Sequence, residues 1–281
     1  MFIADLHIHS HFSRATSRLL VPEMLSLWGQ RKGLNVIGTG DFTHPGWRAE
    51  LLEKLVPAED GLFTLRPEYR PDSSFSVPNA AEPRFLLSCE ISSIYKKNGR
   101  VRKVHNVLLM PGFAEAEAFS KRLEQIGNLH SDGRPILGLD SRDLLEIALE
   151  CCPDVIFIPA HIWTPHFSLF GAYSGFDTLE ECFEDLSGEI HALETGLSSD
   201  PAMNWRLSAL DAYTLVSNSD AHSPANLARE ANIFHTDLSY QNIRHALFHP
   251  EEDAFAGTLE FFPEEGKYHM DGHRACKVCL S

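Results

Sequence analysis

The chain has 281 residues, of which 43% are hydrophobic and 22% charged, and its formal net charge is −15. Such a chain can bury a large core as one domain, and its acidic surplus disfavours non-specific attraction to DNA or anionic membranes. The sequence has no charged leader and no apolar run long enough for a signal peptide or a membrane span. We therefore expect a cytoplasmic protein with no membrane partner.

Short apolar runs rich in β-branched residues alternate with helical patterns along most of the chain, which is typical of βα units around a largely parallel sheet. Strands are predicted at 2–7, 34–39, 84–91, 104–110, 155–161, 190–195 and 215–219. Helices are predicted at 21–32, 113–126, 141–151, 179–186 and 202–209. This order predicts an α/β protein with a TIM-like barrel.

Two segments, 56–83 and 128–139, are predicted as long loops that either shape a substrate cleft or are passive insertions. Asp200, directly before Pro201, is predicted to cap a helix. Four cysteines in apolar or helical contexts are predicted to be small buried hydrophobes rather than disulfide partners: Cys89, Cys151, Cys152 and Cys182. A basic strip either contacts phosphates or lies on a solvated hairpin edge, and it consists of Lys96, Lys97, Arg100, Arg102 and Lys103.

Residues that can bind metal occur at or near the end of every predicted strand. In a βα barrel these ends meet at one rim, where such barrels build their active sites. An isolated HxH pair is more often a solvent-facing alternation, but recurrence at seven strands favours a metal centre. The mixed nitrogen and oxygen donors suit zinc, manganese or iron better than magnesium. The candidates are His7, His9, Asp41, His44, Glu90, His105, His161, Glu194, Asp220 and His222.

Successive motifs of the chain resemble those of the polymerase and histidinol phosphatase (PHP) domain: DLHIHSHFS, GTGDFTH, CEIS, HNVLL, PAHIWTP, LETG and SNSDAH. The resemblance implies a distorted (β/α)7 barrel with two or three divalent metal ions. The first ion would be held by His7, His9, Glu90 and Asp220, and the second by Glu90, His105 and His161. His222 would belong to a third site, where Asp41 and His44 are less secure ligands because GDF replaces the usual TDH.

Longer strings resemble endonuclease Q within that family: MFIADLHIHSHFSRATSR, KGLNVIGTGDFTHPGW, ALETGLSSDP and EEGKYHMDGHRACKVC. This resemblance implies a metal-dependent phosphodiesterase that nicks DNA 5′ of deaminated bases (uracil, hypoxanthine, xanthine) or at abasic sites. Glu90 and Asp220 would be its catalytic carboxylates, and Arg14 and Glu194 would contact substrate. A base extruded from the duplex would stack on one aromatic side chain of the set Trp163, Phe167, Phe170 and Tyr173, each of which is alternatively a core residue.

Residues 1–262 are predicted to form the phosphoesterase domain, and 263–281 a C-terminal tail. Within the tail, His269, His273, Cys276 and Cys279 have a spacing that suits one structural zinc ion or half of a four-cysteine site. Two other functions stay open. One is a small-molecule phosphatase of the histidinol-phosphatase type, which the acidic charge favours. The other is a non-catalytic metal-binding accessory module of a polymerase or helicase.

Overall fold

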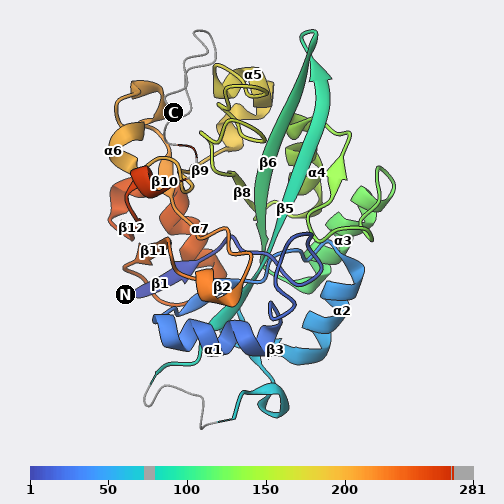
Figure 1. Cartoon of the computed structure of the whole chain (residues 1–281), viewed down its shortest axis with the longest axis vertical. Coiled ribbons are helices and arrows are strands. Elements are labelled where there is room, and N and C mark those ends of the chain that lie inside the picture. The colour runs from blue at the N-terminus through green and yellow to red at the C-terminus, as the bar shows by residue number, and fades with distance from the viewer. Residues whose placement is uncertain (73–79, 267, 269–281) are drawn as a thin grey trace.

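The computed structural model describes residues 1–72, 80–266 and 268, which form a mixed α/β structure (Figure 1). Three strands pair in parallel in the order β1 (Phe2–Asp5), β2 (Val36–Gly38) and β5 (Arg84–Lys97). β5 continues the sheet through an antiparallel neighbour, β6 (Arg100–Met110), which in turn pairs with β8 (Ile156–Pro159). The first five predicted strands are therefore present.

The last two predicted strands, β9 (Ala192–Glu194) and β10 (Thr214–Val216), form a separate parallel pair. The α/β class is thus confirmed, but hydrogen bonds between the described strands do not close the sheet into a TIM-like barrel. The strands nevertheless face a common apolar core. It collects buried side chains from eight strands, among them Ala4, Val36, Leu86, Val107, Ile158, Ala192, Val216 and Phe234.

The prediction of a largely parallel sheet is wrong at 84–110, where β5 and β6 form one long antiparallel hairpin (Figure 1). Its ladder runs without interruption from the Leu87–Met110 pair to the Lys97–Arg100 pair. The reason lies in the two-residue turn, because Asn98 and Gly99 both have positive φ angles, 53° and 73°. An Asn-Gly pair in this conformation matches the twist of a tight hairpin. The basic strip therefore lies along the hairpin, near its tip.

Further strands extend the sheet at both edges. β11 (Ala231–Phe234) pairs antiparallel with β1, and β12 (Phe255–Leu259) pairs with β11. The segment predicted as a loop at 56–83 contains part of β3 (Leu55–Pro57) and all of β4 (Phe63–Leu65), and residues 73–79 lie outside the described part. The second predicted loop, 128–139, contains the short strand β7 (Ile136–Leu137), which pairs with β5.

Five helices agree with the predictions in position: α1 (Pro22–Lys32), α3 (Phe113–Glu124), α4 (Ser141–Cys151), α5 (Leu179–Phe183) and α6 (Pro201–Asn204). The last two are shorter than predicted, since 3-10 turns follow at Glu184–Glu189 and Ser208–Leu210. The Asp200 cap is confirmed, because its side chain accepts a hydrogen bond from Met203 N at 2.7 Å. Two helices were not predicted, α2 (Pro45–Lys54) and α7 (Tyr240–Phe248).

The prediction for the four cysteines is confirmed for three, because Cys89, Cys152 and Cys182 are buried, whereas Cys151 is half-buried. All four thiols are free. Burial raises the pKa of Cys152 to about 11 and that of Cys182 to about 12, so these thiols stay protonated. None of the described helices combines the length and apolar character that crossing a membrane requires.

Candidate metal centre

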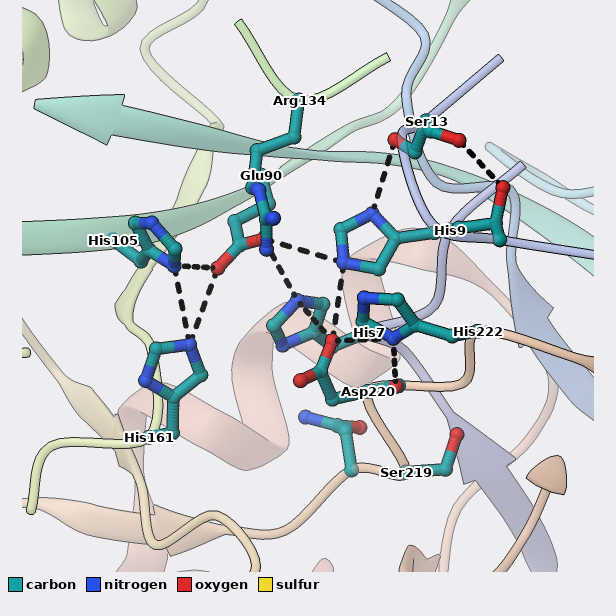
Figure 2. A network of polar contacts seen from close by, with 12 residues as sticks. His7, His9, Ser13, Glu90, His105, Arg134, His161, Ser219, Asp220 and His222 are labelled. Carbon is teal, nitrogen blue, oxygen red and sulfur yellow. Dashed lines mark hydrogen bonds and ion pairs between the residues drawn. The ribbon is translucent and has the colours of Figure 1, made fainter. Parts of the chain in front are cut away.

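Six of the predicted ligand residues meet at one place in the structure (Figure 2). His7 and His9 follow β1, Glu90 lies within β5, and Asp220 follows β10. Their ligand atoms all lie within 4.8 Å of one another. A second group with the same closeness consists of Glu90, His105 and His161, so that Glu90 belongs to both.

In the first group, the two imidazole rings each contact a further carboxylate through Nδ1. Nδ1 of His7 lies 3.0 Å from Glu194 Oε1, and Nδ1 of His9 lies 3.2 Å from Asp41 Oδ1. These contacts turn both Nε2 atoms toward Glu90 and Asp220. Nε2 of His9 is 3.0 Å from Asp220 Oδ1, whereas the buried Nε2 of His7 has no hydrogen-bond partner among the described residues. A buried, unpartnered imidazole nitrogen aimed at two carboxylates fits a metal ligand.

The second group lies on the other side of Glu90. Nε2 of His161 is 3.2 Å from Glu90 Oε1, and its Nδ1 is 3.1 Å from the hydroxyl of Thr164. Nδ1 of His105 lies 3.3 Å from His161 Nε2 and faces the same carboxylate oxygen. Glu90 therefore presents Oε1 to this group, while its Oε2 lies 3.3 Å from His9 Nε2 in the first.

The electrostatics of the two groups differ. Burial opposes charge on His7 and His9, but neighbouring carboxylates, Glu194 and Glu90 at His7 and Asp220 and Asp41 at His9, raise both pKa values well above 6.5. At His105 burial prevails and lowers the pKa to about 4. Although burial alone would raise the pKa of Glu90, electrostatic interactions with His105, Arg134 and His7 hold it well below 4.5, so the shared carboxylate is ionised. These groups can hold cations.

Three residues of the site have left-handed backbone conformations at the ends of their strands, namely Asp41 (φ 51°), His161 (φ 31°) and Asp220 (φ 46°). Such conformations are uncommon for residues other than glycine and are found at functional sites. Close packing fixes His161, because a Cβ atom on the neighbouring Gly196 would lie 2.4 Å from its own Cβ. The left-handed backbone thus gives these three side chains directions that differ from those of residues in a regular strand.

The residues predicted for a third ion lie around the first group. Asp41 accepts hydrogen bonds from Ser10 N at 2.7 Å and from the Ser13 hydroxyl at 2.8 Å, so its contacts support His9. Nε2 of His44 lies 3.1 Å from the carbonyl oxygen of His130, and its Nδ1 caps α2. His222 lies nearer, with its ring 4.6 Å from that of His9. None of the three belongs to a described group of ligand atoms within 4.8 Å.

The two predicted substrate contacts lie at different depths. Glu194 is buried and also accepts hydrogen bonds from His161 N and Asn218 Nδ2, both at 2.8 Å. Its contacts therefore position two histidines of the centre. Arg14 is 76% exposed and lies 3.5 Å from Asp132 Oδ2 at the surface.

Arg134 was not predicted from the sequence. Its Nη1 lies 3.1 Å from Glu90 Oε2, and it extends from the loop before β7 (Figure 2). In the sequence this arginine follows Ser131, Asp132 and Gly133, which indicates a turn and carries no sign of a site.

A cavity of about 620 Å³ adjoins the centre on the side of His105 and His161. Its other lining residues include Phe167, Asn218, Phe261 and Tyr268. Of the aromatics predicted to stack on a base, only Phe167 lines it.

Trp163 and Phe170 pack together with ring centroids 4.9 Å apart, and Tyr173, 70% exposed, stacks on His166. The predicted zinc ligands of the tail, His269, His273, Cys276 and Cys279, lie outside the described residues.

The structure thus joins two groups of candidate metal ligands through Glu90 on an α/β scaffold. Two solved structures of endonuclease Q have this fold, each with a TM-score of 0.80 and 32% identity. One is the lesion-specific endonuclease of Pyrococcus furiosus, of which the alignment covers 64%, against 99% of this chain. The other contains a 27-mer duplex with an abasic lesion at the active site, and here the shares are 65% and 100%. The predicted resemblance to endonuclease Q is confirmed.

The chain is also similar to other proteins. An uncharacterised protein of Bacillus subtilis, YqxK, is 28% identical over 98% of this chain and 68% of its own length. PsfC from Pseudomonas syringae, 12% identical, shares the fold with a TM-score of 0.54 over 92% of this chain and 91% of its own. No family model matches the chain. The chain spans less than two thirds of the length of the endonuclease Q structures.

Proposed function

We propose that the chain is a metal-dependent endonuclease that hydrolyses a phosphodiester bond of DNA beside a damaged nucleotide. The observation that carries the proposal is the position of Glu90 between two groups of ligands, each able to hold a cation. The similarity to a lesion-specific endonuclease over 99% of the chain supports the choice of DNA as substrate. The strands share one apolar core, although their sheet is open, and the ligand residues lie within these strands or follow them.

The donor set fits two divalent ions of the zinc, manganese or iron type. His7, His9, Glu90 and Asp220 would hold one, and Glu90, His105 and His161 the other, since in each of these groups all residues except the half-buried Asp220 are buried. Ions of this kind lower the pKa of a bound water and neutralise charge on phosphoryl oxygens. His222 lies beside the first group and is the residue that would serve a third ion.

The protein's own residues position this chemistry. Glu194 and Asp41 hold the rings of His7 and His9 by their Nδ1 atoms, which fixes the tautomer that leaves Nε2 free to bind metal. The ionised Glu90 and Asp220 place negative charge at the bottom of the site, where it attracts cations and repels a bare phosphate. Substrate binding therefore depends on prior metal binding.

The cavity beside His105 offers a place for an extruded nucleotide. Its volume, about 620 Å³, is in the range of small-molecule sites, and it combines the ring of Phe167 with the amide of Asn218. Enzymes that act at a base in a duplex take it out of the stack, which is easiest where the base is damaged or missing. We propose deaminated bases and abasic sites as the lesions.

The test uses labelled duplexes that contain a single uracil, hypoxanthine or abasic site, and an undamaged duplex. Protein loaded with Mn²⁺ or Zn²⁺ should nick the damaged strand on the 5′ side of the lesion and leave the undamaged duplex intact. Asp220→Asn, which removes a ligand, should abolish cleavage. If every damaged duplex stays intact while phosphate is released from small monoesters, the protein is a phosphatase and the proposal is wrong.

A further inference from the structure

Arg134 occupies a special position in the metal centre. Among the lysines and arginines of the described residues, it alone lies within 4.0 Å of a carboxylate of the centre, with Nη1 3.1 Å from Glu90 Oε2. Its side chain is 28% exposed, whereas that of Glu90 is fully buried. The guanidinium is therefore the more exposed partner of this pair, and Figure 2 shows it beside the Glu90 carboxylate.

The loop that carries Arg134 is fixed by its backbone. Gly133 N donates a hydrogen bond to Phe12 O at 3.1 Å, and Ser92 N donates one to Pro135 O at 3.0 Å. The loop also packs closely against Asp41, the carboxylate that contacts His9 Nδ1, because a Cβ atom on Gly133 would lie 2.3 Å from Asp41 Oδ2. These contacts hold the loop against both strand β5 and the segment after β1. The position of Arg134 is thus set independently of its ion pair with Glu90.

Charge decides what this guanidinium can bind during turnover. Four carboxylates lie in or behind the centre, the buried Glu90, Asp41 and Glu194 and the half-buried Asp220, and Arg134 pairs with Glu90. If Glu90 held cations, the guanidinium would lose this partner and would face positive charge. An anion between the guanidinium and the cations relieves that repulsion. The planar fork of arginine suits phosphate oxygens in particular.

We propose that Arg134 binds the non-bridging oxygens of the phosphate that is cleaved, and that its pairing with Glu90 is the resting arrangement of the metal-free protein. This role rests on the proposed phosphoesterase function, and it assigns the substrate's phosphate a contact that the metal ligands do not provide. The alternative is that Arg134 only balances the charge of Glu90. The two roles predict different affinities of the metal-loaded protein for phosphate when Arg134 is replaced.

The experiment measures binding of inorganic phosphate to protein loaded with Mn²⁺, by calorimetry, for wild type, Arg134→Ala and Arg134→Lys. Loss of a charge-assisted hydrogen bond should weaken phosphate binding about 10- to 100-fold in Arg134→Ala. Arg134→Lys, which keeps the charge but not the fork, should lie between it and wild type. Arg122→Ala is the matched control, because Arg122 pairs with Glu150 at the surface, and it should bind phosphate as wild type does.

Two further readouts separate the alternatives. The affinity for Mn²⁺ without phosphate should be unchanged or higher in Arg134→Ala, since a competing cation is removed from Glu90. On a cleavable duplex, the KM should rise by a factor similar to that for phosphate. Equal phosphate affinity in wild type and Arg134→Ala would overturn the proposal and leave Arg134 as a counter-ion. Absence of DNA cleavage in all variants would refute the endonuclease function, whereas the phosphate result would still decide the role of Arg134.

Discussion

The two ligand groups share Glu90 but differ in what lies behind their imidazoles. In the first, carboxylates hold His7 and His9 and raise the pKa of each ring well above 6.5. In the second, the neutral hydroxyl of Thr164 holds His161, and burial lowers the pKa of His105 to about 4. A carboxylate behind an imidazole makes its free nitrogen a better ligand for a cation. We therefore expect the first group to bind a divalent cation more tightly than the second.

The largest effect should come from a change at Glu90, because this residue belongs to both ligand groups. Glu90→Gln keeps the shape of the side chain but removes the charge that both groups use. We expect activity to fall by at least about 10³-fold, because both ions lose a shared ligand. Metal content measured by mass spectrometry should fall at both sites. Retention of a full metal complement by this variant would contradict the shared role of Glu90.

Replacing the side chains that contact Nδ1 of His9 and of His161 should change the metal affinity of the two sites to different extents. Asp41→Asn removes the carboxylate behind His9, and we expect metal affinity at the first site to fall about 10- to 100-fold. Thr164→Val removes the hydroxyl behind His161 and should weaken the second site by less than about tenfold. Calorimetric titration with Mn²⁺ measures both. Equal losses in the two variants would show that the backing carboxylates do not distinguish the sites.

The pH dependence of metal binding should also differ between the two ligand groups. His7 and His9 have raised pKa values, so without metal they bind protons at neutral pH, and a cation must displace these protons. Affinity of the first site should therefore rise with pH between about 6 and 8, about tenfold per unit for each proton displaced. Calorimetry in buffers of different ionisation enthalpy counts the protons.

Glu194→Gln tests the cause of this proton release. It removes a carboxylate that raises the pKa of His7, and it should reduce the number of protons released at the first site. Glu230→Gln is the matched control, because Glu230 is a buried carboxyl that hydrogen-bonds to Ser217 rather than to a histidine. An unchanged proton count in Glu194→Gln would show that Glu194 does not raise the pKa of His7.

The smallest effect concerns that control residue itself. Burial raises the pKa of Glu230 from 4.5 to about 8, so the folded protein retains a proton that the unfolded chain releases above pH 4.5. The free energy of unfolding should therefore fall as the pH rises from about 4.5 to 8, by up to about 4 kcal/mol. In Glu230→Gln this part of the slope should be absent. Denaturant unfolding at pH 5 and pH 8 checks it, and identical slopes in both proteins would disprove the shift.

Much of this arrangement follows from local sequence patterns. Apolar runs such as 155–161 predict a strand from a few residues, and the parallel order of β1 and β2 brings His9 near Asp41. Convergence of the six ligands could be predicted because each follows or lies within such a run. Their action as metal ligands remains a prediction.

Other features depend on weak local signals or on packing between segments that lie far apart in the sequence. The reversal of β6 was signalled by Asn98-Gly99, whereas Arg134 lies in a turn whose approach to Glu90 depends on packing far along the chain. Helix α7 had a helical spacing of Tyr240, Ile243 and Leu247 that could have revealed it.

The β5–β6 hairpin has a consequence for how relatives of this chain can vary in length. Glu90 pairs with Val107 and His105 with Ser92, so the two ligands lie diagonally on one face of the ladder. A single residue gained or lost within either strand between these points would shift the register and turn one of them to the opposite face. Natural insertions and deletions should therefore be concentrated at the Asn98-Gly99 tip, and the strands should keep their length even where their residues change.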